Sequence, residues 1–194
     1  MKVLIINGHP DKMSFTSSIA SALQRKYQGK LIHLADLKFN PVFTGFDKTI
    51  PLEDDLIQAQ KDITEAKHII ITTPIWWSTY PALLKGFLDR VLLPDFAFSY
   101  KPGATFQDKL LKGRTAELYL LSDAPAWYRK YLLRDPAATS LKRDVLGFCG
   151  IKVKKIHRIG NVRNINAEER IKFIEKISWP RSHSNEASDI KEFR

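Results

Sequence analysis

The strongest constraint on the fold is the regular alternation of short apolar runs with segments of helical periodicity. The first run, Lys2–Asn7, is continuously apolar and β-branched, as expected for a strand that is covered on both faces. Alternation of this kind favours a parallel, doubly wound sheet. The five predicted strands are Lys2–Asn7, Leu31–Leu37, His68–Thr73, Thr115–Leu121 and Ile151–Ile156.

Helices are predicted between these strands from apolar residues at helical spacing. The first helix carries Ile19, Ala20, Leu23 and Tyr27, and we expect Gly29 to end it. The other helices are predicted at Pro51–Ala66, at Pro81–Val91, within Ala138–Phe148 and at Ala167–Ile177. Two long irregular connections remain, residues 39–50 and 94–113, and loops of that length usually serve binding or an interface.

Two features stand where a ligand would bind in such a sheet. After the first strand, Gly8-His9-Pro10 breaks the run, and hydroxyl residues follow from Ser14 to Ser18 at the start of a helix. A helix N-terminus offers free N–H groups to a phosphate, although Ser14 or Thr16 could also be simply a helix cap. The glycine-rich dinucleotide fingerprint is absent.

The second feature is a pair of tryptophans after the third strand. Trp76 and Trp77 lie in a loop that Pro74 and Pro81 bracket. Packing in a core or an interface is the alternative explanation of these rings. With strands in the order 2-1-3-4-5, however, the two loops meet at the switch point between the first and third strands. Together they favour a planar, phosphorylated ligand, and a flavin nucleotide fits.

Composition limits the other possibilities. The chain has 194 residues, enough for one domain, and a net charge of +10. The basic residues are spread along the chain and no nucleic-acid motif is present, so we expect no nucleic-acid partner. The positive charge is suited to a phosphorylated cofactor or an anionic substrate. A solvated basic surface without a function is the alternative. We expect no metal site.

The cellular location is predicted from the cysteine content and from the length of the N-terminal apolar run. The single cysteine, Cys149, cannot form an intrachain disulfide and fits a reducing compartment. The N-terminal apolar run is too short for a signal peptide or a membrane span, which favours a cytoplasmic protein without membrane insertion. Residues 1–180 are predicted to form one domain, and the polar residues 181–194 a poorly ordered tail.

Several motifs, in order along the chain to about Val153, resemble those of the NAD(P)H:quinone oxidoreductase family of flavodoxin-like flavoproteins. That family includes regulatory flavoproteins of potassium efflux systems. The matching stretches are Asn7-Gly8-His9-Pro10 with Ser14-Phe15-Thr16, Pro74–Trp77, Pro81–Val91, Phe96-Ala97-Phe98 and Phe148-Cys149-Gly150. The resemblance implies a flavodoxin-like three-layer α/β sandwich.

The resemblance also implies roles for individual residues. FMN, or else FAD, would be the cofactor, NAD(P)H the hydride donor and a quinone the acceptor, in a two-electron ping-pong reaction of a homodimer. Tyr128 is the candidate for the family's active-site tyrosine. The aromatic connection Phe96–Phe106 is a candidate dimer contact, although ordinary surface packing is the more common role of such residues. The cofactor-binding residues would be His9, Ser14, Phe15, Thr16, Pro74, Ile75, Trp76, Trp77, Ser122 and Asp123.

The chain departs from the family pattern after the fourth strand. Ser122-Asp123-Ala124-Pro125 stands where many relatives have Thr and Gly, and an acidic Asp123 beside a reduced flavin is unfavourable unless it points away. A regulatory flavoprotein of a potassium efflux system therefore stays as the alternative function. A flavodoxin-type electron carrier ranks last because this chain is basic. His33, His68 and His157 are interpreted as structural, and Cys149 as a buried small hydrophobe.

Overall fold

The computed structural model describes residues 2–46, 51–103 and 105–178, and its centre is a five-stranded parallel sheet. The strands are β1 (Val3–Asn7), β2 (Lys30–His33), β3 (His68–Pro74), β6 (Thr115–Leu121) and β7 (Lys152–Ile159). Their order across the sheet is β2-β1-β3-β6-β7, and all four pairs are parallel. The predicted order 2-1-3-4-5 is confirmed.

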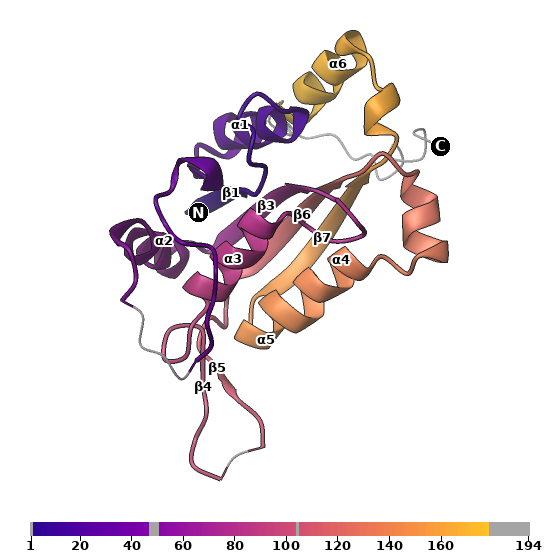
Figure 1. The fold of residues 1–194 in the computed structure, drawn as a ribbon. Helices are drawn as coiled ribbons and strands as arrows, with labels where there is room; N and C mark the ends of the chain where they lie inside the picture. The colour runs from indigo at the N-terminus through magenta and orange to yellow at the C-terminus, as the bar shows by residue number, and fades with distance from the viewer. Residues whose placement is uncertain (1, 47–50, 104, 179–194) are drawn as a thin grey trace.

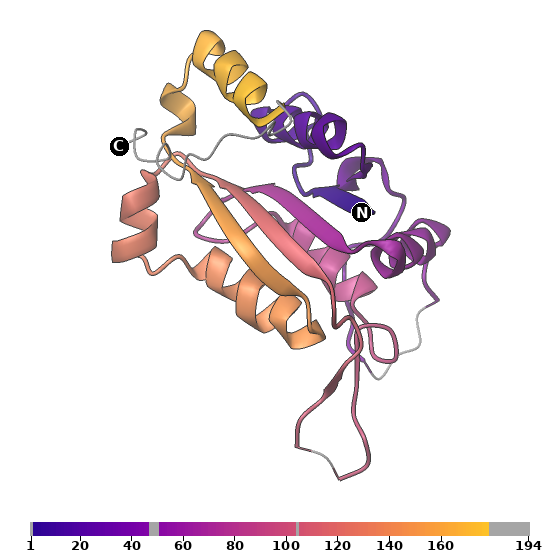
Figure 2. The ribbon, with the colours of Figure 1, turned by 180° about the vertical axis from the view of Figure 1, so that it is seen from behind.

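Helices cover both faces of the sheet, so the predicted three-layer arrangement is also confirmed (Figures 1 and 2). One face carries α1 (Phe15–Tyr27) and α6 (Ala167–Ser178). The other carries α2 (Asp54–Glu65), α3 (Ala82–Val91) and a long helical segment of residues 136–149. Because each strand turns alternate side chains to the two layers, Leu4 and Ile6 join one hydrophobic cluster while Val3 and Ile5 join the other.

Pairing partners explain where two strands differ from their predicted bounds. β2 ends at His33 because its only neighbour, β1, ends at the opposite residue Asn7. Residues Leu34–Asp36, predicted as strand, instead form a 3₁₀ turn, η1. β7 continues past Ile156 because β6 offers partners as far as Leu121, which pairs with Ile159.

The end of α1 also differs from the prediction. The residue in the left-handed conformation is Gln28, with a φ of 48°, and not Gly29. Gly29 is required for a different reason, since a Cβ at this position would come within 2.7 Å of the Val3 carbonyl oxygen. The glycine therefore allows helix α1 to return closely past the first strand.

Two regions differ in detail from the sequence predictions. The connection after α3 carries a short antiparallel hairpin, β4 (Phe98–Ser99) and β5 (Asp108–Lys109), which projects from the body of the molecule (Figure 1). The predicted helix within 138–148 begins as α4 (Pro136–Thr139), continues as the π-helix η3 (Ser140–Leu146) and ends as α5 (Gly147–Cys149).

The remaining elements are a π-helical turn, η2 (Tyr128–Leu132), and a 3₁₀ turn, η4 (Val162–Asn164). Within residues 2–46, 51–103 and 105–178, no helix has both the length and the apolar character needed to cross a membrane. The predicted polar tail, residues 181–194, lies outside the described residues.

Candidate functional site

Three loops meet at the carboxyl edge of the sheet because β1, β3 and β6 are neighbours in it. They follow Asn7, Pro74 and Leu121. The first two loops touch where the His9 ring meets the Trp76 ring edge-on, with centroids 5.6 Å apart. The second and third are joined by a backbone hydrogen bond of 2.7 Å from Ile75 N–H to the Leu121 carbonyl. The sequence-predicted residues of the three loops are therefore brought to one edge.

Asn7 fixes the shape of the first loop. Its fully buried side chain donates from Nδ2 to Ser17 Oγ at 2.8 Å and lies 2.9 Å from His33 Nδ1. Its Oδ1 accepts from His9 N–H and from the Thr72 hydroxyl. One amide thus ties β1 to α1, β2 and β3 at the point where the chain leaves the sheet. This role was not predictable from the residues around Asn7, apart from its membership in the first motif.

The start of α1 combines a helix cap with a site suited to an anion. Ser14 Oγ accepts from Ser17 N–H at 3.2 Å, so Ser14 is the helix N-cap. Phe15 and Thr16 are buried in the first turn, where backbone N–H groups have no acceptor within the helix. That turn holds no acidic residue, so the positive end of the helix dipole is not offset there. These residues fit a phosphate group.

His9 is held as a neutral hydrogen-bond donor beside this helix start. Burial lowers the pKa of His9, against a smaller opposing effect of Asp11. Its Nδ1 accepts from Asp11 N–H at 2.9 Å, which places the proton of the neutral ring on Nε2. A neutral His9 therefore keeps one N–H available to a ligand oxygen.

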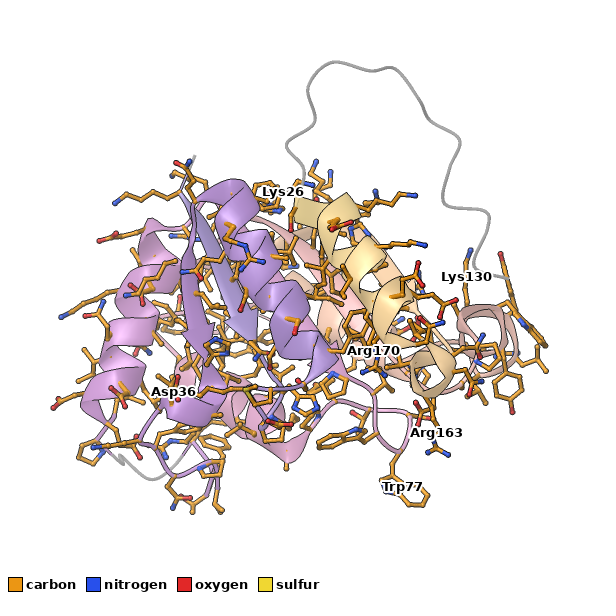
Figure 3. All side chains as sticks on the ribbon, turned by 90° about the horizontal axis from the view of Figure 1, so that it is seen from above. Lys26, Asp36, Trp77, Lys130, Arg163 and Arg170 are labelled. Carbon is orange, nitrogen blue, oxygen red and sulfur yellow. The ribbon has the colours of Figure 1, made fainter. Side chains whose placement is uncertain are left out.

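The double tryptophan forms a tight, two-residue turn. Trp76 and Thr79 exchange two backbone hydrogen bonds, of 2.8 and 2.9 Å. The central residues Trp77 and Ser78 have positive φ values of 50° and 62°, the combination found in a type I′ turn. Trp76 is half-exposed, whereas Trp77 is 99% exposed and projects away from the ribbon (Figure 3).

This turn narrows the set of backbone groups that could face a ligand. Pro74 has no N–H, and the N–H groups of Ile75 and Trp76 are donated to Leu121 and Thr79. The N–H groups of Trp77 and Ser78 take no part in the turn's own pair of hydrogen bonds. A ligand edge would therefore meet the apex of the turn.

In the third loop, Ser122 is buried and its hydroxyl donates to the Ala124 carbonyl at 2.8 Å. Asp123 is exposed and accepts from the backbone N–H of Arg163 at 3.1 Å and from its Nη2 at 3.0 Å. Its carboxylate is thus directed to the turn after β7 and paired with a cation. Ser122 acts in this structure by shaping the loop.

The third loop continues into an aromatic surface on η2. The rings of Trp127 and Tyr128 meet at right angles with centroids 6.0 Å apart, and both are exposed at the edge of the site. Tyr131 lies on the same turn, and a hydrogen bond from Lys130, 2.9 Å long, lowers the pKa of its hydroxyl. The sequence analysis did not select Tyr131, although its position beside Lys130 was a usable signal.

A groove of about 470 Å³ between α1 and α6 opens beside the first loop. Its walls combine apolar and basic side chains, among them Lys12, Met13, Phe15, Arg25, Arg170 and Ile171. The Arg170 guanidinium lies 5.3 Å from the centre of the Phe15 ring. The groove was not predicted from the sequence, because Arg170 and Ile171 are remote in sequence from the first loop.

The other titratable candidates occupy structural positions. His68 Nδ1 lies 2.8 Å from the Thr115 hydroxyl, and His157 Nε2 lies 2.9 Å from a Glu117 carboxylate oxygen. Cys149 is buried, and burial raises the pKa of its thiol to about 11. In the parts of the chain that the structure describes, no three His, Cys, Asp or Glu residues gather in a way that could hold a metal ion.

The sheet order and its three loops define a protein of the flavodoxin-like class, and a family model for the flavodoxin-like fold matches residues 1–178. The ribosyldihydronicotinamide dehydrogenase [quinone] of Pongo abelii is 30% identical in an alignment 186 residues long that covers 78% of each chain. An uncharacterized NAD(P)H oxidoreductase of Haemophilus influenzae is 27% identical over 188 residues, covering 90% of this chain and 91% of the relative. The chain belongs to the NAD(P)H:quinone oxidoreductase family.

Solved structures agree on the fold. The crystal structure of Smu.1420 from Streptococcus mutans superposes with a TM-score of 0.77 at 29% identity, covering 92% of this chain and 97% of the other. An FMN-dependent NADH-azoreductase from Bacillus anthracis, in complex with FMN, superposes with a TM-score of 0.66 over 92% of this chain and 96% of its own. At 19% identity, that likeness supports the fold alone.

Proposed function

We propose that this chain is a flavin-dependent NAD(P)H:quinone oxidoreductase that transfers two electrons as a hydride. One observation carries the proposal. The capped N-terminus of α1, which is suited to a phosphate, lies beside the turn of Trp76 at the switch point of the sheet. Relatives named as NAD(P)H oxidoreductases and quinone dehydrogenases support the same conclusion.

The residues of the chain would bind and orient the reactants. The first turn of α1, the Ser14 cap and His9 Nε2–H would hold the phosphate. Trp76 and the apex of its turn would border one side of the flat ring, and the loop from Ser122 would close the other side. Trp127 and Tyr128 would form a wall of the slot in which the two substrates stack on the ring. A bound flavin supplies the capacity to accept a hydride from NAD(P)H and pass it to a quinone. Use of one slot by both substrates implies ping-pong kinetics.

A second copy of the chain would complete the slot. The hairpin β4–β5 and its surroundings expose Phe46, Tyr100 and Phe106, by 62%, 56% and 82%. Large exposed apolar side chains that gather on one projection are typical of an interface. We propose that this arm is the dimer contact, and light scattering of wild-type protein and a Phe106→Ser variant tests it.

The groove beside the phosphate loop bears on the choice of flavin. FMN would end at the start of α1, whereas the adenosine half of FAD needs a further apolar and basic surface such as the groove between α1 and α6. FMN is the cofactor we propose, because the Ser14 cap, the first turn of α1 and His9 provide for a single phosphate group. Mass spectrometry of the released flavin distinguishes the two. A cytoplasmic location and a preference for NADPH, which the positive charge favours, are further parts of the proposal.

The absorption spectrum of the purified protein, followed by anaerobic addition of NADPH, tests the function directly. Oxidised-flavin bands that bleach within seconds and return on addition of a quinone are the expected result. Ser14→Ala should weaken flavin binding about tenfold, because it removes the cap that holds the phosphate loop. Thr64→Ala, which removes an exposed helical hydroxyl on α2, is the matched control. A colourless protein that fails to take up added FMN or FAD would overturn the proposal.

A further inference from the structure

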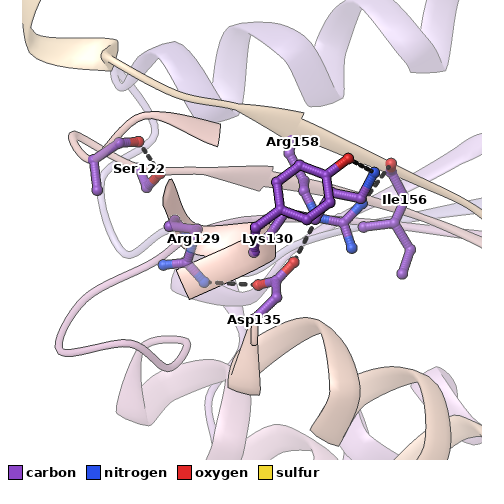
Figure 4. A network of polar contacts seen from close by, with 8 residues as sticks. Ser122, Arg129, Lys130, Asp135, Ile156 and Arg158 are labelled. Atoms are coloured by element: carbon purple, nitrogen blue, oxygen red, sulfur yellow. Dashed lines mark hydrogen bonds and ion pairs between the residues drawn. The ribbon is translucent and has the colours of Figure 1, made fainter. Parts of the chain in front are cut away.

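A buried ion network includes Arg129 of η2, the turn that begins with Tyr128 and follows Trp127. Asp135 is 4% exposed, and its two carboxylate oxygens accept from Arg129 Nη2 at 2.9 Å and from Arg158 Nε at 2.5 Å (Figure 4). Arg129 belongs to the π-helical turn η2, whereas Arg158 is the second-last residue of β7. The network therefore ties the turn that follows Trp127 to the edge strand of the sheet.

Helix capping does not explain the buried carboxylate. Asp135 precedes α4, but its side chain makes no cap hydrogen bond to that helix, and both oxygens are directed to the arginines. The backbone is strained at the same place, since Arg134 and Asp135 have φ values of 54° and 44°. A backbone N–H bond of 2.9 Å from Asp135 to the Arg129 carbonyl closes the loop. Backbone strain and a buried charge at the same position indicate that this conformation has a functional role.

The middle of the same loop is held from the same strand. A Cβ added at Gly160, just after β7, would lie 2.5 Å from Ala126 N and 2.9 Å from the Ala124 carbonyl oxygen. Gly160 thus lets the chain approach the residues before Trp127 closely. Contacts to β7 and the turn after it fix the loop at its start, through Asp123 and Arg163, at its middle and at its end.

We infer that Asp135 is a positioning residue that, through Arg129 and Arg158, fixes Trp127 and Tyr128 as a rigid wall of the slot for the flat substrates. This role rests on the proposed flavin-dependent function. A wall that is already ordered spares each arriving substrate the entropy of ordering two large side chains. Loss of the network should therefore weaken substrate use while leaving the phosphate loop, and hence flavin content, unchanged.

Asp135→Asn and Arg158→Gln test the role, and Glu53→Gln is the matched control. The control also removes the partner of a buried arginine, Arg90 of α3, which is 3% exposed and held at 2.7 Å by Glu53 at the start of α2. The two network variants should keep the wild-type flavin-to-protein ratio and lose about tenfold in kcat/KM for a benzoquinone. Trypsin should cleave faster after the exposed Lys130 in these variants. Under native conditions, the control should leave the flavin-to-protein ratio, kcat/KM and the rate of cleavage after Lys130 unchanged, although it lowers the global stability.

A double-mutant cycle shows whether Asp135 acts through the wall. Trp127→Ala should lower kcat/KM about tenfold in the wild-type background and less than twofold in the Asp135→Asn background. If Asp135→Asn does not fold, the same cycle is built on Arg158→Gln. Fully additive effects, or unchanged trypsin cleavage after Lys130, would overturn the positioning role while wild-type turnover stands. A wild-type protein that binds no flavin would instead overturn the proposed function.

Discussion

A single substitution in the turn at Trp77 should raise the stability of the protein and lower its activity. Trp77 and Ser78 both occupy the left-handed region, where a residue with a Cβ is held at a cost of order 1 kcal/mol. Asn tolerates this conformation and is the residue most favoured in such turns together with Gly. Trp77→Asn should therefore relieve strain, and it loses no packing because the ring is 99% exposed.

The expected stabilisation is about 0.5–1 kcal/mol, which corresponds to a rise in Tm of about 2 °C for a chain of this length. Activity should move the other way, because the substitution deletes an aromatic ring at the apex of the turn that borders the proposed slot. We expect kcat/KM for a quinone to fall about tenfold. Urea unfolding with an unchanged m-value and steady-state kinetics measure the two effects on the same preparation.

Ser78→Gly is the matched control, since it relieves left-handed strain at the neighbouring residue and removes no ring. It should leave kcat/KM unchanged, with a smaller effect on stability because glycine also gains entropy in the unfolded chain. A Trp77→Asn variant that is destabilised by more than 0.5 kcal/mol, on the order of the strain itself, would refute the strain argument. A stabilised variant with wild-type kinetics would refute the functional one.

Three further substitutions test other parts of the structure. Phe87→Ala should destabilise the fold by about 3–5 kcal/mol in urea unfolding, because this fully buried side chain fills the core between α3 and the sheet. Glu53→Gln should cost about 2–4 kcal/mol by leaving the buried Arg90 without a charged partner, and a circular-dichroism melt will measure it. Burial lowers the pKa of His33, so the unfolded chain binds more protons at that residue, and stability should decline as pH falls below about 6.5. His33→Asn should reduce the fall of the urea midpoint between pH 7.5 and pH 5.5, and His9 and His68, whose pKa values burial also lowers, should account for part of the fall that remains.

The sheet was predictable because its signal is local and periodic. Apolar runs located four strands within a few residues of their bounds, and the alternation of element types indicated a parallel, doubly wound sheet. The order 2-1-3-4-5 was the flavodoxin-like arrangement of such a sheet. The bounds failed where a partner strand decides them, since the chain alone does not reveal that His33 is the last residue of β2 to face β1. The hairpin β4–β5 was missed for a related reason, because two-residue strands carry no periodic pattern.

The candidate site was also predictable where it depends on sequence motifs and not predictable where it depends on tertiary contacts. The loops after β1 and β3 were found from hydroxyls, prolines and tryptophans that lie close together in sequence. The support of the third loop was not found, since Asp135, Arg158 and Gly160 come from separate elements and have meaning only once β6 and β7 are paired. The groove between α1 and α6 is hidden in the sequence for the same reason.

The pairing of Asp123 bears on the chemistry expected at this edge. An unpaired carboxylate beside an electron-rich reduced ring would oppose the accumulation of charge there. Arg163 donates two hydrogen bonds to the carboxylate of Asp123. At the end of the same loop, two arginines, Arg129 and Arg158, pair with the single carboxylate of Asp135. The charged groups bound to the third loop therefore sum to a positive charge although the loop contains an acidic residue. A site built in this way suits a ligand that becomes more negative when it is reduced, so the departure at Asp123 is compatible with the family's chemistry.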